Sequence, residues 1–340
     1  MNAHENQQSA ADLDRLQVTF RQATESDAKA INSLVAANLD VFPGLNIRYT
    51  RPSVESWKKS FERGGSLFLD SYILADAVIA GKHFSPAGYA RIYRFPAAGG
   101  QECGYIRGPW VDPSLDEQLV TTLAREIASK TLEKVKEFGI PLARARVPLL
   151  LPSRLSLFRD FLGFVTIDRL YSYGKQLLEE VSVASLSLPG VVFSLYQGTF
   201  AEDMEVIELN NTVFPRDRFT AESFGFLKKQ YCDFKEGNYI HVARVDGKLA
   251  GMVWSGFQQR ADGFTVCEIQ ELAVYPAYQR RGIARALVFH CLQQAREKGI
   301  QEVTTTISTF NQPSIRTFES CGFTCQPLTG DELLEKKTTC

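Results

Sequence analysis

Several residue types are scarce in this chain of 340 residues, and each scarcity argues against a class of protein or a kind of site. It has four histidines and seven cysteines, and the cysteines stand at irregular positions. That usage fits scattered thiols better than a disulfide framework, and it offers no His and Cys cluster at metal-ligand spacing. We therefore expect no metal site.

Long apolar runs and an excess of one charge are missing too. The polar N-terminus lacks the basic and apolar regions of a signal peptide, and no later stretch is long and apolar enough to span a bilayer. The formal net charge of -1 argues against a nucleic-acid binder, which needs a surplus of Lys and Arg. The sequence thus predicts a cytoplasmic protein with no membrane and no nucleic-acid partner.

The composition, with 44% hydrophobic and 23% charged residues, is that of a folded globular protein. The length favours two domains rather than one. Strand and helix patterns alternate along the chain, which is typical of an α/β or α+β layer fold. We therefore expect two layered domains of ordinary size.

The same order of elements occurs twice. In each half a strand runs into a proline, and then follow a helix that stops at a glycine, a second strand, and a short helix that stops at Gly-Phe. The valines before the prolines are Val111 and Val274, 163 residues apart, and the glycines of Gly-Phe are Gly163 and Gly322, 159 residues apart. This offset is too long for a solenoid repeat and suits a duplicated domain.

The domain boundaries follow from composition. The Ser-rich stretch 181–187 and the Pro189-Gly190 pair break the periodicity between the halves. We expect a flexible N-terminal tail over 1–16, a first domain over 17–180, a second domain over 190–329 and a C-terminal tail over 330–340.

One loop of the second half carries the features of a phosphate site. Gly282 stands among Arg280, Arg281 and Arg285, after a strand and at the start of a helix. Unpaired N–H groups and the positive dipole end at a helix start attract an anion, glycine allows close approach, and arginine adds charge-assisted bonds. The alternative is a solvated surface, but the helix dipole disfavours arginine there, which favours a functional role.

This loop lies within a longer pattern that resembles the GNAT family of N-acetyltransferases. Gln279 to Ala284 match the family's (Gln/Arg)-x-x-Gly-x-(Gly/Ala) signature. The other matching pieces, at the family's usual spacing, are Asp246 to Gly251 at a hairpin turn, Leu272 to Pro276 at a strand end, and Asn311, Ser314, Phe318 and Gly322-Phe323 in the last helix. The resemblance implies two tandem GNAT-type domains of an α/β (α+β) fold, each a mixed, mainly antiparallel sheet flanked by helices.

The resemblance also implies the co-substrate, acetyl-CoA or another acyl-CoA. Backbone amides of the loop would hold the pyrophosphate, and the strand before it would pair with the pantetheine arm like an added strand. Asn311 would bind the pantetheine, although it also fits a plain helix cap. The expected cofactor-binding residues are Leu272, Ala273, Val274, Gln279, Arg280, Arg281, Gly282, Ile283, Ala284, Arg285 and Asn311.

Acyl transfer to an amine needs a base, because an ammonium has no lone pair. By the resemblance the base is Glu268, and the alternative is a solvated or salt-bridged strand carboxylate. Strand alternation places Gln270 on the face of Glu268, where it would orient substrate, and Glu271 on the other, unless a bulge near Leu272 resets the count. Phe214 is a weaker substrate candidate that also fits the core.

The proton donor departs from the family pattern. Phe318 stands where many members have a tyrosine that protonates the leaving thiolate, and a phenyl ring cannot donate. Because a free thiol titrates near ~8.5, the thiolate is a fair leaving group near neutral pH without that acid.

The first half has no counterpart of the phosphate loop. Its segment 108–118 contains no Arg and no Gly after the proline, and Asp112, Asp116 and Glu117 would repel a pyrophosphate. This suggests a degenerate copy before an active one, which resembles the architecture of tandem GNAT enzymes such as mycothiol synthase.

We therefore expect an N-acetyltransferase that acts on an amine of a small or peptide-like molecule. A non-catalytic acyl-CoA sensor and a Fem-type aminoacyltransferase remain as alternatives. The chain could be a monomer or a homodimer.

Overall fold

The computed structural model describes residues 16–41, 53–55, 57–58, 61, 71–96, 102–177, 187–215, 218–231, 238–259 and 263–338. It contains two compact units, the N-terminal unit (Met1–Arg94, Glu102–Ile167 and Glu332–Cys340) and the C-terminal unit (Phe95–Gln101 and Asp168–Asp331). Almost all of the expected N-terminal tail and most of the expected boundary segment lie outside the described residues.

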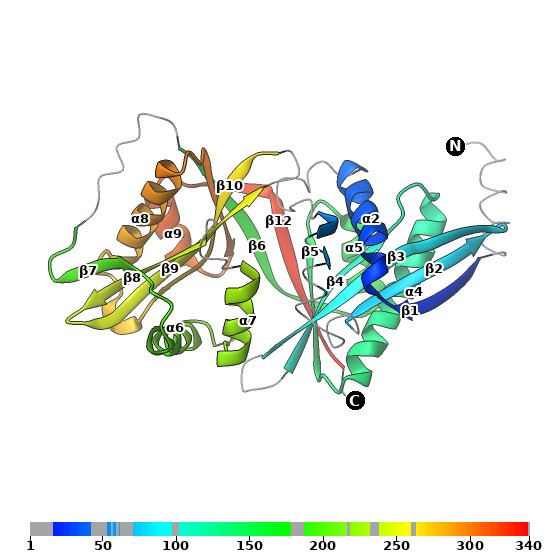
Figure 1. Ribbon diagram of the computed structural model, residues 1–340, viewed down its shortest axis with the longest axis horizontal. Helices are drawn as coiled ribbons and strands as arrows, with labels where there is room; N and C mark the ends of the chain where they lie inside the picture. The colour runs from blue at the N-terminus through cyan, green and yellow to red at the C-terminus, as the bar shows by residue number, and fades with distance from the viewer. Residues whose placement is uncertain are drawn as a thin grey trace. The chain divides into compact units, whose positions relative to one another are not determined.

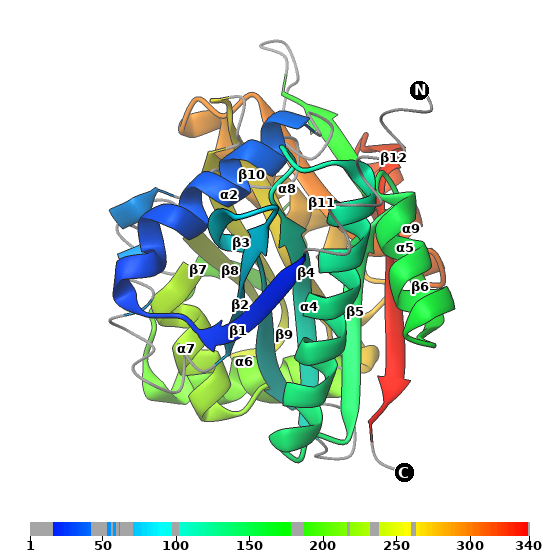
Figure 2. The ribbon, with the colours of Figure 1, turned by 90° about the vertical axis from the view of Figure 1, so that its right-hand side faces the viewer.

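In the N-terminal unit the strands run in the order β1-β2-β3-β4-β5, and the end of β12 runs beside β5. The long helix α4 packs its apolar stripe on one face of these strands, as Figure 2 shows. The elements are β1 (Gln17–Gln22), η1 (Glu25–Asp27), α2 (Ala28–Val41), β2 (Tyr72–Ile79), β3 (Lys82–Pro96), β4 (Glu102–Val111), α4 (Glu117–Glu137), β5 (Leu142–Pro148), α5 (Pro152–Ser156) and η4 (Leu157–Phe161).

In the C-terminal unit the order is β6-β11-β10-β9-β8-β7, with the first part of β12 beside β6. Helices α6 and α7 pack on one face, and α8 and α9 pack on the other (Figure 1). The elements are β6 (Val165–Gln176), β7 (Val191–Leu195), α6 (Phe200–Val213), α7 (Ala221–Tyr231), β8 (Asn238–Val245), β9 (Lys248–Gln259), β10 (Thr265–Val274), η5 (Pro276–Tyr278), α8 (Ile283–Glu297), β11 (Glu302–Ser308), α9 (Gln312–Ser320) and β12 (Thr324–Lys337).

Helix α4 shows why the predicted helices form. Asp116 caps its N-terminus by accepting hydrogen bonds from the N–H groups of Gln118 and Leu119. Leucine and isoleucine side chains then recur at helical spacing and are buried, as at Leu123 and Ile127. Among the helices that the structure describes, none combines the length and apolarity needed to cross a membrane.

The structure differs from the expectation at the C-terminus. Residues 330–337, expected to be a tail, belong to strand β12, and Glu332 and Leu334 are buried. Glu332 accepts a hydrogen bond from the Thr166 hydroxyl at 2.9 Å, and Arg144 pairs with Glu335 at 2.8 Å. Glu332 and Glu335, which were expected in a tail, therefore have partners far away in the sequence.

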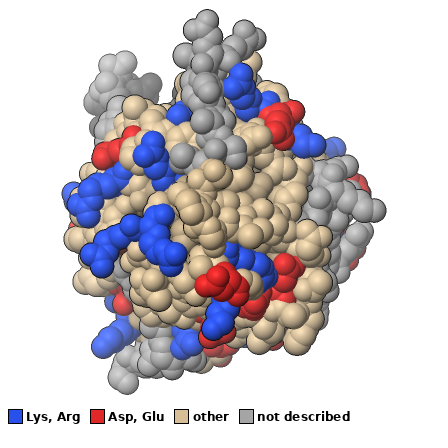
Figure 3. Space-filling model, turned by 90° about the vertical axis from the view of Figure 1, so that its left-hand side faces the viewer, with Lys and Arg blue, Asp and Glu red and all other residues tan. Residues whose placement is uncertain are grey.

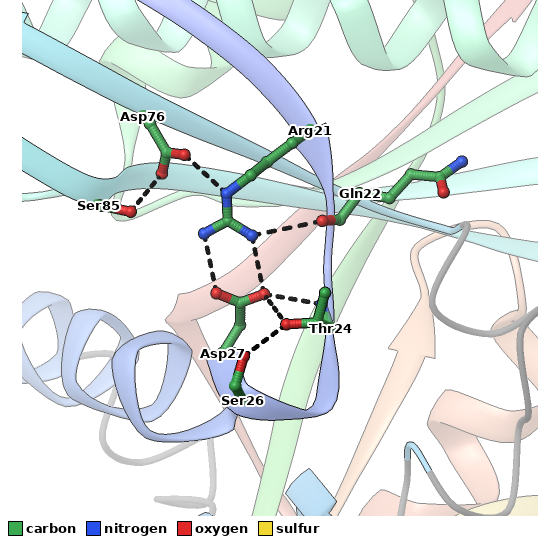
Figure 4. Close-up of polar contacts among 7 residues, drawn as sticks. All are labelled: Arg21, Gln22, Thr24, Ser26, Asp27, Asp76 and Ser85. Carbon is green, nitrogen blue, oxygen red and sulfur yellow. Dashed lines mark hydrogen bonds and ion pairs between the residues drawn. The ribbon is translucent and has the colours of Figure 1, made fainter.

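A network around Arg21 fixes the start of the N-terminal unit (Figure 4). The Arg21 guanidinium donates two hydrogen bonds of 2.8 Å to Asp27 and one of 2.6 Å to Asp76. Asp27 also accepts from the backbone N–H of Thr24. Burial alone would raise the pKa of Asp27, but the bonds from Arg21 and Thr24 outweigh it and lower that pKa. The network thus ties β1, β2 and the start of α2 together.

In the C-terminal unit, a pair of histidines lies where β8 packs against α8. The ring centroids of His241 and His290 are 6.1 Å apart, and His241 is 9% exposed. Neither Nε2 atom has a hydrogen-bond partner within the described residues. Burial, with a smaller contribution from His290, lowers the pKa of His241 to about 4. The folded protein therefore holds His241 neutral.

This burial predicts a loss of stability on acidification. The pKa of a histidine in the unfolded chain is ~6.5. Below that pH the unfolded chain binds a proton at this histidine, whereas the folded chain stays unprotonated there until about its own lower pKa. The free energy of unfolding should fall as the pH drops from 6.5 towards 4, by at most about 3 kcal/mol from this residue. In urea titrations at several pH values, His241→Leu should lack this part of the slope. An identical slope in variant and wild type would contradict the prediction.

Candidate functional site

Two parallel strands part in the middle of the C-terminal sheet. Strands β10 and β11 pair at Cys267–Val303, Glu268–Thr304 and Ile269–Thr305, and the described ladder ends there although both strands continue. On its other side β10 stays paired with β9 as far as Val274. The last part of β10 therefore presents a backbone edge to the opening between the strands, and such an edge can pair with an extended ligand.

A bulge lies at the same point. The register of β10 against β9 shifts between Ile269 and Glu271, so Gln270 is the extra residue. Ile269 pairs with Ser255 before the bulge, and Glu271 pairs with Trp254 after it. The alternation of side chains between faces thus restarts at Gln270.

The bulge puts two carboxylates on one face. Glu268 lies opposite Gly256 and Glu271 opposite Trp254, and these two β9 residues share the face that α6 and α7 cover. The simple alternation, which placed Glu271 on the other face, therefore does not hold, and the condition that a bulge resets the count is met. Glu271, which simple alternation places on the other face, therefore joins Glu268 as a candidate residue of the site. Its face follows from the register of β10 against β9, which the sequence alone does not give.

Glu268 is half-buried and held by a neighbour. The side chain of Gln258, on β9, donates a hydrogen bond of 2.5 Å to its carboxylate. The bond leaves the carboxylate further lone pairs that can accept a proton. Glu268 is therefore an oriented carboxylate on the α6 and α7 side of β10.

The loop after β10 has an unusual backbone. Arg280 and Gly282 both have positive φ angles, +61° and +81°, and a non-glycine residue adopts this region at a cost. A Cβ on Gly282 would meet only the Leu188 side chain, 3.6 Å away, so the backbone conformation rather than space requires glycine here. These two residues turn the chain from the loop into the first turn of α8.

The N-terminus of α8 keeps its N–H groups available. Its N-cap residue is Gly282, which has no side chain to accept their hydrogen bonds. In contrast, Asp116 caps α4, Thr199 caps α6 and Asn311 caps α9. The first turn of α8 is thus built like an anion site, with the positive end of the helix dipole beside it.

The loop side chains take different parts. Gln279 donates a hydrogen bond of 3.1 Å to the Val274 carbonyl, so it fixes the loop to the end of β10. Arg280, Arg281 and Arg285 are exposed. The Arg281 and Arg285 guanidinium carbons lie 5.7 and 5.6 Å from the rings of Tyr278 and Phe289. Figure 3 shows a face of the molecule on which Lys and Arg side chains form several groups, with Asp and Glu side chains near some of them.

The other predicted residues lie partly in the core. Ile283 and Val274 point into the core cluster under α8, and Ala273 lies in the cluster under α6. These residues can contribute only backbone groups to a site. Phe214 packs beside the α6 cluster, which is the core role that its sequence context allowed. The half-buried Leu272 and Ala284 also pack against the α8 cluster.

The last helix is held by Asn311 and Phe318. The Asn311 side chain accepts a hydrogen bond of 3.2 Å from the Ser314 N–H, so its capping role is real. Phe318 is 2% exposed and packs edge-on against Phe323 at 5.0 Å. Its ring belongs to the core of the C-terminal unit.

Comparisons with known proteins agree with this geometry. Residues 204–323 match the family model described as the acetyltransferase (GNAT) family. These residues hold β10, the loop, α8 and Asn311, so this part of the chain is similar to the family where the candidate site lies. A mycothiol acetyltransferase from Thermobifida fusca is 29% identical over 92 residues, which cover 26% of this chain and 28% of that protein. The chain thus matches about a quarter of that relative's length.

Solved structures extend the likeness to the whole chain. A GCN5-related N-acetyltransferase from Sphaerobacter thermophilus has a TM-score of 0.68 at 17% identity, and the match covers 95% of this chain and 96% of that one. A tandem GNAT protein from the clavulanic acid biosynthesis pathway has a TM-score of 0.68 at 15% identity, with 95% and 99% covered. The predicted fold class, two tandem GNAT-type domains of mixed sheet and helices, is confirmed.

The site predicts how a substitution at Gly282 acts. Gly282→Glu places a side chain in a strained φ region and a negative charge beside the helix start. We expect it to abolish the thermal stabilisation by acetyl-CoA, which for the wild type is about 2.7 kcal/mol at a hundredfold excess over the dissociation constant. Differential scanning fluorimetry measures this shift.

The matched control is Gly299→Glu. Gly299 lies just past the other end of α8, has a φ of +72°, and has nothing within 4 Å of an added Cβ. This variant carries the same backbone strain and the same charge, but away from the loop, so its shift with acetyl-CoA should match that of the wild type. A shift retained in Gly282→Glu would contradict the anion site.

Proposed function

We propose that the C-terminal unit is an N-acetyltransferase that moves an acetyl group from acetyl-CoA to the amine of a small or peptide-like molecule. The observation that carries the proposal is one short segment, 270–285, which joins the free edge of β10 to the uncapped start of α8. One feature suits an extended amide-bearing arm and the other a pyrophosphate. Coenzyme A carries both in this order.

Within this proposal the chain's backbone binds and its side chains orient. Acetyl-CoA supplies a thioester carbonyl that an amine can attack. The N–H groups of Ile283, Ala284 and Arg285 would hold the pyrophosphate, with charge from Arg280 and Arg281. The edge from Leu272 to Val274 would pair with the arm, and a backbone N–H there would stabilise charge on the carbonyl oxygen. Asn311, besides capping α9, would bind the arm.

Glu268 is the proposed general base. It would take a proton from the attacking ammonium, directly or through one water, so that the neutral nitrogen forms the new C–N bond. The C–S bond then breaks and the thiolate leaves with the sulfur's electron pair. The nitrogen gives up its second proton to water, and the thiolate takes a proton from water, so that an amide and a free thiol result. Gln258 fixes the Glu268 carboxylate during this step. Gln270 at the bulge and Glu271 would orient the amine.

The N-terminal unit is proposed to be a copy that has lost the co-substrate. At the start of α4 the Asp116 carboxylate accepts from the N–H groups of Gln118 and Leu119. An internal anion thus already occupies the place where α8 offers its helix start to a phosphate. We therefore infer one acetyl-CoA for each chain.

One observation favours a second candidate, a non-catalytic acyl-CoA sensor. Phe318, at the place where a proton-donating tyrosine is expected, has a ring buried in the core. A sensor would bind acetyl-CoA without turning it over. Release of free thiol across a panel of amines separates the two functions, because only the enzyme consumes the thioester.

The proposed base gives a direct prediction. Glu268→Gln keeps the shape and the bond to Gln258 but cannot accept a proton at neutral pH. We expect kcat to fall about 10²-fold to 10⁴-fold, with the thermal shift by acetyl-CoA unchanged. Glu297→Gln, on the exposed C-terminal end of α8, should keep full activity. Unchanged kcat at saturating amine would remove Glu268 as the base.

A further inference from the structure

In the N-terminal unit, one face of the sheet carries a group of arginines and tyrosines that does not belong to the degenerate phosphate region. In the second half of β3, Ala90 and Ile92 pack under α4, and on β5 Ala143 and Ala145 do the same. Their neighbours along each strand must therefore point to the other face. That face carries Tyr72 on β2, Tyr89, Arg91 and Tyr93 on β3, Tyr105 and Arg107 on β4, and Arg144 and Arg146 on β5. We call these residues the arginine–tyrosine face.

The register brings these side chains together. Tyr72 lies opposite Arg91, and Tyr105 lies opposite Arg144. The Arg91 guanidinium carbon lies 3.8 Å from the Tyr93 ring and 4.7 Å from the Tyr72 ring, and Arg91 donates a hydrogen bond of 2.7 Å to the Tyr93 hydroxyl. The guanidinium planes are thus stacked and oriented by aromatic rings, which restricts their rotamers.

Two guanidiniums share one ring. The Arg107 guanidinium carbon lies 5.2 Å from the same Tyr93 ring that Arg91 covers. Because both guanidiniums lie close to one ring, their positive charges repel each other, and the repulsion is greater where water is partly excluded. Burial alone would raise the pKa of Tyr93, but Arg91 and Arg107 outweigh it and lower that pKa. The potential at Tyr93 is therefore one that stabilises a negative charge.

The face occupies the position that holds the candidate base in the other half. The ladder between β4 and β5 ends at Ile106–Ala145, just as that between β10 and β11 ends at Ile269–Thr305. Ile106 and Ile269 are 163 residues apart, the offset of the duplication, and the same offset relates Tyr105 to Glu268. Both halves thus part their strands at the equivalent point, and only the chemistry beside the opening differs.

The face also has an open end. Arg91 is buried, Tyr93 is half-buried and Arg107 is exposed. A small molecule can therefore reach the guanidinium of Arg107 from solvent, and the Tyr93 ring, which Arg91 also covers, lies beside that guanidinium. Guanidinium forks bind carboxylate and phosphate oxygens in pairs, and the tyrosine rings offer apolar contact to the rest of such a molecule.

We propose that the arginine–tyrosine face of the N-terminal unit is a binding site for a small molecule that carries a carboxylate or phosphate group, with Arg91 and Arg107 as its charge-bearing ligands. The half that has lost the phosphate loop would thus keep a ligand site at the position of the acceptor site in the other half. This site is separate from the acetyl-CoA site and does not depend on it.

The experiment is a calorimetric titration of the full chain with benzoate and, separately, with inorganic phosphate. Benzamide serves as the neutral analogue of benzoate. We expect saturable binding of at least one anion and no comparable binding of benzamide. Arg107→Met, at an exposed position, should lower the affinity for the anion roughly tenfold to a hundredfold. A folded Arg91→Met variant should show the same loss.

Arg94→Met is the matched control. Arg94 lies on the same strand as Arg91 but stacks on Phe138 at the C-cap of α4, 4.0 Å from its ring, and so faces away from the site. It should bind the anion as the wild type does. Binding of phosphate alone would identify the oxyanion as a phosphate, and binding of benzoate alone would identify it as a carboxylate. Absence of saturable binding by both anions, or equal affinity in Arg107→Met and wild type, would overturn the proposal.

Discussion

The C-terminal unit depends on one extra residue in a strand. Gln270 interrupts the pairing of β10 with β9, at the point where the pairing with β11 ends. The same irregularity therefore opens the sheet, frees a backbone edge, and turns Glu268 and Glu271 to one face. A regular parallel pair would satisfy every backbone group of β10 and leave no edge for a ligand. The chain offers its main chain for binding only because the sheet is imperfect there.

The parts of the site that depend on local sequence could be predicted, and those that depend on strand pairing could not. Glycine is typical of a position with a positive φ, and arginines are unfavourable beside the positive end of a helix dipole. The loop around Gly282 could therefore be recognised from the sequence. The place of the bulge is set by pairing with β9, and so the face of Glu271 could not be read from alternation alone. The strand β12 was missed for a similar reason, because the partners of Glu332 and Glu335 lie more than 160 residues earlier in the chain.

The two halves keep one backbone plan and differ in charge at equivalent points. Where α8 begins with a bare glycine, α4 begins with Asp116, which satisfies its own helix start. Where β10 carries Glu268, β4 carries Tyr105 beside Arg144. One half thus presents positive backbone groups and a carboxylate, and the other presents arginines on its sheet. A duplicated fold can divide its binding tasks in this way without any change in topology.

We infer that one chain binds one coenzyme A along β10 and at the start of α8. A crystal structure of the chain grown with coenzyme A tests it most directly. We expect density for the pyrophosphate at the N–H groups of Ile283 to Arg285, and for the pantetheine arm along Leu272 to Val274. Pyrophosphate density at the start of α4, or coenzyme A bound away from the opening between β10 and β11, would contradict it.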